Sequence, residues 1–275
     1  MSGSDFTPAV TPVELLGGVW VKREDAWSRG GASGAKSRAM FTAAEGAPGL
    51  MSAGARISPQ LERAALVAAA LGIPARLHTG WGNDTDETRT ALAAGATLLR
   101  HRPGRLSVIR ARYRTDAAAH PDWAHVPFGM DLPVYRDQVA AQAHALEHRE
   151  FRRIIVPVGS GSTLAAICCG LDDADNPIPV VGVVVGAEPT GLLNTRYPKW
   201  RNRTALVRAA VAYEKPVRAD LGGLVLDPHY EAKCLPHLAE GDLLWAVGRR
   251  ASADPCPYCA RPPGWDACPV HAAPR

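Results

Sequence analysis

The chain has 275 residues, of which 47% are hydrophobic and 21% charged, and its formal net charge is +4 at pH 7. This composition is typical of a globular protein with one large or two modest domains. No stretch approaches the roughly 20 apolar residues that a membrane helix needs. The first residues lack the basic region and apolar run of a secretory signal, so we expect a cytoplasmic protein with no membrane partner.

Lysine is scarce in this chain, since only five of the 31 basic residues are lysines. A buried lysine can lose its proton and act as an amine nucleophile, whereas arginine stays protonated inside proteins. A lysine in an unusual setting is therefore a candidate catalytic residue.

Strands and helices are expected to alternate along the chain. Apolar runs predict strands over residues 18–23, 75–79, 96–100, 153–158, 180–185 and 243–248. Helical spacing predicts helices over residues 58–71, 84–94 and 135–146, and further helices that begin near residues 37 and 163. Ser58 suits an N-cap, and Gly72 ends that helix. This alternation favours an α/β fold with mainly parallel sheets.

A glycine-rich turn, Gly159-Ser160-Gly161-Ser162-Thr163, joins an expected strand to an expected helix. Small residues let backbone N–H groups approach an anion, and the positive end of the helix dipole adds to the attraction. The Gly-Lys-Ser/Thr ending and the Gly-x-Gly-x-x-Gly spacing are absent, so the turn suits a phosphate monoester better than a nucleotide. The alternative is an ordinary strand-to-helix turn.

Lys36 follows a second glycine-rich stretch, residues 28–34, close to an expected helix start. The positive end of a helix favours the neutral form of an amine, which is the nucleophilic one. Lys36 is therefore a candidate nucleophile, and the alternative is a solvated lysine at a helix end.

The order of these segments resembles the fold-type II pyridoxal-phosphate enzymes, the tryptophan synthase β-like superfamily. The aminocyclopropane-carboxylate deaminase and D-cysteine desulfhydrase branch is the most similar. The resemblance spans roughly residues 12–250 and is more specific than any single motif. It rests on Val21-Lys22-Arg23-Glu24-Asp25, the turn before Lys36, the segments 52–60 and 159–163, Gly186-Ala187-Glu188-Pro189 and residues 226–233.

The resemblance implies pyridoxal 5′-phosphate as the cofactor and assigns roles to particular residues. Lys36 would bind the cofactor covalently and then take the Cα proton as the catalytic base, with the pyridine ring as electron sink. Lys22 would be a structural lysine, and Tyr213 and Tyr230 are weaker candidates. The phosphate would be held by Gly159, Ser160, Gly161, Ser162 and Thr163. The substrate would be bound by Ser52, Gly54, Arg56, Ser58 and Gln60.

The sequence departs from the family pattern at several places, including an unusual Arg56 and a shorter segment than usual between Lys36 and Ser52. Ile57 stands where the family usually has Asn or His. Ser162 replaces a common glycine, and the strand over residues 243–248 lacks the Ser or Thr that normally meets the pyridine nitrogen. A cofactor-binding but inactive protein is therefore one alternative.

Three of the six cysteines lie close to the C-terminus. Cys256-Pro-Tyr-Cys259 and Cys268-Pro-Val-His271 are two pairs with the spacing of a structural zinc site, for which three thiolates and one imidazole are suitable ligands. The family does not normally carry such a tail, so a structural or partner-docking zinc knuckle is expected over residues 251–275. The alternative is a redox-active or unliganded tail. The other cysteines, Cys168, Cys169 and Cys234, are expected to be buried thiols in a reducing compartment.

A basic cluster contains Arg100, Arg102, Arg105, Arg110, Arg112 and Arg114, with His101. Such a cluster could contact the phosphates of a nucleic acid. The commoner explanation is a solvated surface of the smaller domain. Tyr113 is the only aromatic residue in the cluster, which gives poor support for stacking with a single strand.

Together these observations predict a two-domain α/β enzyme. Residues 1–40 and 130–250 are expected to form the larger domain, and residues 41–129 the smaller one. The expected activity is deprotonation of Cα of an amino acid or amine-bearing substrate, followed by elimination, replacement or deamination, as in a lyase, a deaminase or a β-replacement transferase. One alternative substrate is an amino-acid moiety attached to nucleic acid. The candidate partners are the small-molecule substrate, a second copy of the chain and a nucleic acid.

Overall fold

The structure is a computed structural model of the chain, and it describes residues 9–146 and 151–251. Within these ranges no helix combines the length and the apolar character needed to cross a lipid bilayer. The same ranges contain no group of three His, Cys, Asp or Glu side chains that could hold a metal ion. The proposed zinc ligands Cys256, Cys259, Cys268 and His271 lie outside the described residues, so the zinc knuckle stays a prediction.

The described residues form two compact units. The first contains residues 9–27, 131–146 and 151–248, and the second contains residues 28–130 and 249–251. This first boundary differs from residue 40, where the sequence analysis placed it. The reason is that helix α1 (Gly34–Ala44) packs against α2 (Pro59–Leu71) and against the short strands β3 (Ser28–Arg29) and β4 (Ala32–Ser33).

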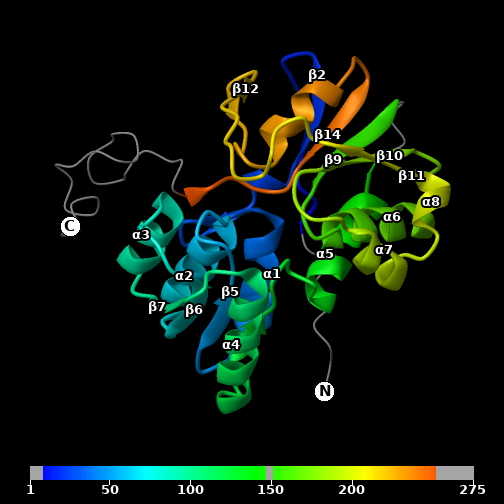
Figure 1. The fold of residues 1–275 in the computed structure, drawn as a ribbon. Coiled ribbons are helices and arrows are strands. Elements are labelled where there is room, and N and C mark those ends of the chain that lie inside the picture. The colour runs from blue at the N-terminus through cyan, green and yellow to red at the C-terminus, as the bar shows by residue number, and fades with distance from the viewer. Residues whose placement is uncertain (1–8, 147–150, 252–275) are drawn as a thin grey trace. The chain divides into compact units, whose positions relative to one another are not determined.

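The first unit is built on a six-stranded sheet with the strand order β1-β2-β14-β9-β10-β11 (Figure 1). Its strands are β1 (Val13–Leu16), β2 (Val19–Arg23), β9 (Arg153–Val158), β10 (Val180–Val184), β11 (Thr204–Arg208) and β14 (Asp242–Ala246). Only β1 runs antiparallel to its neighbour. All residues of β10 and β14 are buried, as expected for parallel strands that are covered on both faces.

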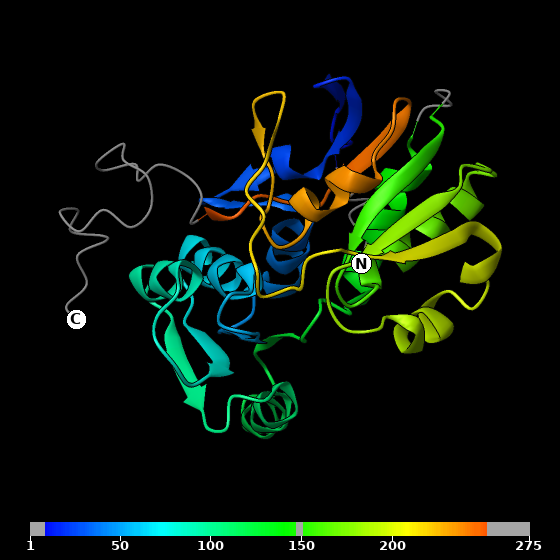
Figure 2. The same ribbon diagram turned by 45° about the horizontal axis from the view of Figure 1, so that its top comes forward.

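Helices cover one face of this sheet, and an irregular segment covers the other (Figures 1 and 2). Helix α5 (Pro133–His144) packs along α6 (Ser162–Asp173), and α7 (Thr190–Arg196) and α8 (Trp200–Arg203) also contact α6. Gly182 of β10 faces α6, because an added Cβ there would lie 2.9 Å from Leu164. Val181 and Val183 point to the other face. They pack there with Ala232 and Cys234 of the 3-10 helix η2 (Glu231–His237).

Shorter elements complete the first unit. The 3-10 helix η1 (Glu24–Ala26) follows β2, and β12 (Asp220–Leu221) pairs with β13 (Leu224–Val225) in a two-stranded sheet. Lys22 of β2 is fully buried, and its Nζ donates to the carbonyl oxygen of Thr11 at 2.6 Å. Through this hydrogen bond Lys22 has a structural role in the first unit.

The second unit contains a four-stranded, fully parallel sheet in the order β7-β6-β5-β8. The strands are β5 (Leu50–Ala53), β6 (Ala75–Gly80), β7 (Thr97–His101) and β8 (Ala124–Val126). Met51 packs with Ile109 and Tyr113 of helix α4 (Leu106–Ala119) on one face. The next residue, Ser52, points to the other face, where it accepts a hydrogen bond from Gln60 of α2. Helix α3 (Asp86–Ala93) packs against α2.

Most predicted elements are confirmed, including the ends of α2. Ser58 accepts a hydrogen bond from the Gln60 N–H, and Gly72 has the left-handed φ of 69° at the C-cap. Helix α1, however, begins at Gly34 rather than at residue 37, so Lys36 lies inside its first turn. Cys168 and Cys234 are buried free thiols, as expected, while Cys169 is half-buried.

Helix α4 was not predicted, although it has 14 residues. Ile109 and Tyr113 are its only buried side chains, and two apolar positions are too few to show a helical period in the sequence.

Candidate functional site

Neighbouring side chains pack closely against the turn after β9. Gly161 is the N-cap of α6 and has a φ of +99°, a left-handed conformation that L residues with a Cβ rarely adopt. An added Cβ at Gly161 would lie 3.1 Å from the Cβ of Pro189, and one at Gly159 would lie 3.2 Å from the ring of Tyr230. Only glycine therefore fits at these two positions without a shift of Pro189 or Tyr230.

The start of α6 gathers hydrogen-bond donors. The first N–H groups of a helix have no acceptor within the helix, and α6 has no acidic residue in its first turn. The fully buried Ser162 has its Oγ 3.3 Å from Ser160 Oγ. Thr163 Oγ1 lies 2.6 Å from the hydroxyl of Tyr135 on α5. This set of backbone N–H groups and hydroxyls, without a carboxylate, suits an anion such as a phosphate.

The turn after β10 lies beside the turn after β9. An added Cβ at Gly186 would be 3.8 Å from the Cα of Gly159. The two turns follow adjacent parallel strands, and the carboxyl ends of such strands are the usual place for a ligand in α/β proteins. Tyr230 borders this place too, and its hydroxyl donates to Tyr213 Oη at 3.4 Å. The structure therefore places Gly186 and Tyr230 beside residues 159–163, and the role of this turn in holding a phosphate stays a prediction.

Lys36 belongs to the second unit. It is the third residue of α1, after Gly34 with a φ of +88°, and its side chain is half-buried. The first turn of α1 contains no acidic residue, so the positive end of the helix dipole is not compensated there. An extra positive charge is disfavoured at such a place, which suits an amine that must be neutral to react.

The five residues predicted to bind substrate lie in β5, in the loop that follows it and at the start of α2, and several of them form hydrogen bonds within the second unit. Ser52 is fully buried and donates to the carbonyl oxygen of Val126 at 3.1 Å. Gln60 Nε2 donates to Ser52 Oγ at 3.0 Å and to the carbonyl oxygen of Pro127 at 2.9 Å. Ser58 caps α2. These bonds favour a positioning role for Ser52, Ser58 and Gln60, which hold the loop in place.

The two remaining residues of the predicted substrate set lie in the same loop. The Gly54 N–H donates to the carbonyl oxygen of His78 at 3.0 Å. The Arg56 Nη1 donates to the carbonyl oxygen of Asn83 at 2.6 Å, and Arg56 is half-exposed. Arg56 is thus the one charged group among the five predicted substrate-binding residues.

Arg250 was not singled out from the sequence, and no local pattern marks it. It is buried, forms an ion pair with Glu87 of α3, and donates to the carbonyl oxygen of Ile57 at 2.9 Å. Arg250 lies four residues after the end of β14 (Asp242–Ala246), and it contacts the predicted substrate loop through the backbone of Ile57.

No protein-family model and no curated protein sequence matches this chain. Solved structures share its fold. A protein described as an ACC deaminase homologue superposes with a TM-score of 0.74 at 21% identity, over 89% of this chain and 90% of that one. A fungal L-serine ammonia-lyase from Rhizomucor miehei superposes with a TM-score of 0.64 at 15% identity, over 88% and 94%. For maize serine racemase the TM-score is 0.61 at 12% identity, over 87% and 88%. The chain therefore has the tryptophan synthase β-like fold, with mainly parallel sheets, that the sequence predicted.

Proposed function

We propose that this protein is a pyridoxal 5′-phosphate-dependent enzyme of the lyase or deaminase type, which acts at Cα of an amino acid or amine-bearing substrate. The observation that carries the proposal is the turn Gly159–Thr163. Its two glycines are bordered by Tyr230 and Pro189, and it leads into a 12-residue helix with no acid in its first turn. The structural neighbours described as an ACC deaminase homologue and an L-serine ammonia-lyase support the class of reaction.

In this proposal the start of α6 binds the cofactor phosphate. Backbone N–H groups after Gly161 and the hydroxyls of Ser160, Ser162 and Thr163 are the donors, and the helix dipole favours the negative charge. Glycine at positions 159 and 161 allows the turn its shape, because a Cβ there would press on Tyr230 or Pro189. When bound, the cofactor supplies a ring that takes up the electron pair as a bond to Cα breaks.

Lys36 is the residue that we assign to covalent attachment and proton transfer. Lys36 Nζ would hold the cofactor covalently, and as a free neutral amine it would accept the proton from Cα. The uncompensated positive end of α1 favours the neutral amine over the ammonium. The half-buried side chain also limits the access of water to the amine.

The substrate carboxylate is assigned to the loop over residues 52–60. Arg56 would provide the positive charge. Gly54 leaves room for Leu61 beside the loop, because an added Cβ would lie 3.3 Å from that side chain. Ser52, Ser58 and Gln60 would act mainly by holding the loop through the hydrogen bonds described above. We also retain the zinc knuckle of Cys256, Cys259, Cys268 and His271 as a structural addition to the enzyme.

The test uses the colour of the cofactor and the small number of lysines. The purified protein should be yellow, and borohydride should fix the cofactor to Lys36, which peptide mapping by mass spectrometry can locate among five lysines. Lys36→Ala should be colourless, whereas the control Lys215→Ala, at an exposed lysine, should stay yellow. Attachment to Lys233, which is buried and donates to the carbonyl oxygens of Ala212 and Tyr213, would show that the assignment is wrong.

A second measurement separates an enzyme from a cofactor-binding protein that does no chemistry. D- and L-amino acids are added while the absorbance of the cofactor is followed and the products are analysed. A spectral shift with ammonia or a keto acid released supports the enzyme. A spectral shift without any product supports the inactive alternative.

A further inference from the structure

Three loops meet at one edge of the sheet in the second unit. Residues 54–58 follow β5, residues 81–85 follow β6, and residues 102–105 follow β7. These strands are adjacent and parallel, so the three loops lie at the carboxyl edge of the sheet, where α/β proteins usually bind ligands. The first loop is part of the segment to which we assign the substrate. We call the surface formed by these three loops the arginine edge.

Hydrogen bonds join the loops into one surface. Arg56 of the first loop donates to the carbonyl oxygen of Asn83 in the second, at 2.6 Å. Arg100 at the end of β7 donates to the carbonyl oxygen of Gly82 at 3.0 Å. The arginine edge is therefore continuous with the predicted substrate loop.

Part of the positive charge on the arginine edge is not compensated. Arg56, Arg102 and Arg105 form no ion pair with any residue that the structure describes, whereas Arg100 is paired with Asp84. Arg102 and Arg105 are exposed to solvent. Guanidinium groups with free charge are well suited to phosphate oxygens, which they bind through two parallel hydrogen bonds.

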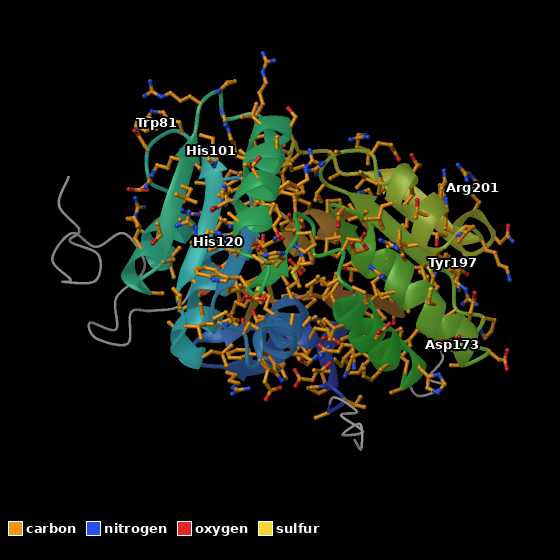
Figure 3. All side chains as sticks on the ribbon, turned by 90° about the horizontal axis from the view of Figure 1, so that it is seen from below. Trp81, His101, His120, Asp173, Tyr197 and Arg201 are labelled. Atoms are coloured by element: carbon orange, nitrogen blue, oxygen red, sulfur yellow. The ribbon has the colours of Figure 1, made fainter. Side chains whose placement is uncertain are left out.

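Trp81 adds a flat aromatic surface to this charge. Its side chain is 54% exposed, and the guanidinium of Arg102 lies over the indole ring at 3.9 Å from the ring centroid. Figure 3 shows Trp81 at the rim of the unit, near His101. Tyr113, the aromatic residue within the basic segment, belongs to α4 and is buried against the sheet, whereas Trp81 lies 21 residues before Arg102 in the sequence. Nucleic-acid bases stack on exposed indole and guanidinium planes. The fold therefore brings an exposed aromatic side chain to the basic segment, which has none of its own.

The positive charge continues along one flank of α4. Arg112 follows Arg105 by seven residues, which is two helical turns or about 10 Å along the helix axis. It is exposed, forms no ion pair within the described ranges, and is close enough to His101 to contribute to the lowering of its pKa. A row that runs from Trp81 and Arg102 through Arg105 to Arg112 is longer than one phosphate group. This length favours a polymer over a mononucleotide.

We propose that the arginine edge binds a single-stranded nucleic acid, and that the amine on which the active site acts is carried by that strand. The second part rests on the proposed function, and the first part does not. A lipid surface would also satisfy the positive charge. The stacked pair of Trp81 and Arg102 favours bases, because both groups present flat faces to a ligand that is itself flat.

Binding is tested on the full-length protein with a fluorescent single-stranded oligodeoxynucleotide of roughly 20 nucleotides, by anisotropy at several salt concentrations. The double variant Arg102→Glu, Arg105→Glu should weaken binding at least about tenfold at low salt and lower the salt slope by about 2. Trp81→Ala should weaken binding roughly tenfold through lost stacking. The matched control is Arg201→Glu in the first unit, because Arg201 also lies over a tryptophan, Trp200, at 4.2 Å (Figure 3). It should change binding less than about twofold.

Several results would overturn the proposal. One is an oligonucleotide affinity that the variants leave unchanged, since the strand would then be held elsewhere in the chain. Another is binding to vesicles of phosphatidylserine and phosphatidylcholine without binding to the oligonucleotide. The second part is tested by adding an oligonucleotide that bears an aminoacyl group and following the absorbance of the cofactor, with the unmodified strand as control. A protein that is yellow and processes free amino acids but binds no strand would refute this inference and leave the proposed function intact.

Discussion

The imidazole rings of His78 and His101 are stacked in the second unit, with their centroids 5.1 Å apart and His78 Nδ1 at 3.0 Å from His101 Nε2. His78 Nε2 lies 2.9 Å from Asp116 Oδ2. Burial acts to raise the pKa of Asp116, but hydrogen bonds from Arg76 and His78 outweigh it, and the net effect is a lowered pKa. The ionised carboxylate can only accept, so His78 carries its proton on Nε2, and His101 Nε2 donates to His78 Nδ1. One arrangement of protons therefore satisfies the whole network.

This network predicts that the second unit loses stability in mild acid. Burial is the main cause of the lowered pKa of both His78 and His101, and Arg112 adds to it at His101. An unfolded histidine has a pKa of about 6.5, so below that pH the unfolded chain binds more protons than the folded one. The free energy of unfolding should be constant above about pH 7.5 and fall as the pH drops through 6.5. The slope is at most about 1.4 kcal/mol per pH unit for His78, and less for the more exposed His101.

Urea unfolding at several pH values between 5.5 and 7.5 (about one unit on either side of the histidine pKa) measures this dependence. His78→Gln removes one of the titrating groups and should flatten the slope. The control His144→Gln, at an exposed histidine of the first unit, should leave it unchanged. Equal slopes for His78→Gln and the unmodified protein would show that this histidine does not couple protonation to folding.

Gly161→Ala should damage both the stability of the first unit and its binding of phosphate. The new Cβ would sit on a backbone with a φ of +99° and 3.1 Å from the Cβ of Pro189. We expect a loss of about 1–2 kcal/mol in the free energy of unfolding and weaker binding of inorganic phosphate and of pyridoxal phosphate. Calorimetric titration and urea unfolding measure the two effects.

The control for Gly161 is another glycine of the same unit. Gly191 lies in helix α7, and an added Cβ there would meet no heavy atom within 4 Å. Gly191→Ala should be neutral or stabilise the unit by up to about 1 kcal/mol, because alanine is the better helix former. If both substitutions have the same effect, the conformation of Gly161 is not what shapes the phosphate turn.

Removal of the carboxylate of Glu87 should strongly destabilise the second unit. Glu87 and Arg250 form an ion pair in which both side chains are largely buried, and the substitution would take this carboxylate away from the buried guanidinium. Loss of one partner of a buried pair typically costs about 3–5 kcal/mol. Chemical unfolding of Glu87→Ala measures the loss.

The adjacent residue provides the comparison. Asp86 is paired with Arg89, but the two side chains are 50% and 40% exposed. Asp86→Ala should therefore cost no more than about 1 kcal/mol. Similar losses for the two variants would mean that Arg250 does not depend on Glu87 for its place beneath the predicted substrate loop.

The C-terminal cysteines predict a bound metal. Elemental analysis of the purified protein should find about one zinc per chain, as expected for a closed site of four ligands. The double variant Cys256→Ser, Cys259→Ser should lose the zinc. Cys169→Ser, which replaces a half-buried thiol of helix α6, should keep it. A protein without zinc in both the unmodified and the Cys169→Ser forms would leave the two cysteine pairs as a redox-active or unliganded tail.

Local chemistry explains why much of the fold could be predicted. The ends of α2 could be predicted from the sequence without knowledge of any tertiary contact. The reason is that the residues that set them, Ser58, Pro59 and Gly72, act on backbone groups within a few residues. The continuous apolar runs of β9 and β10 likewise marked strands that are buried on both faces. The glycine-rich turn between β9 and α6 was readable for the same reason, because its conformation depends on the absence of side chains at Gly159 and Gly161.

Contacts between distant residues could not be predicted in this way. The pair of Glu87 and Arg250 joins residues 163 positions apart, and neither residue has a local signature. Trp81 and Arg102 belong to two loops that only the pairing of β6 with β7 brings to one edge. The position of α1 in the second unit follows from its packing on α2, a contact that the boundary expected at residue 40 did not include.

From the order of its residues alone, this chain specified an alternation of strands and helices, a glycine turn suited to phosphate and a lysine at a helix start. These features depend on backbone conformation over short stretches, where each residue acts on its immediate neighbours. The arginine edge, the stacked histidines and the buried Arg250 came only from the folded chain, because charge, stacking and desolvation depend on which distant side chains become neighbours.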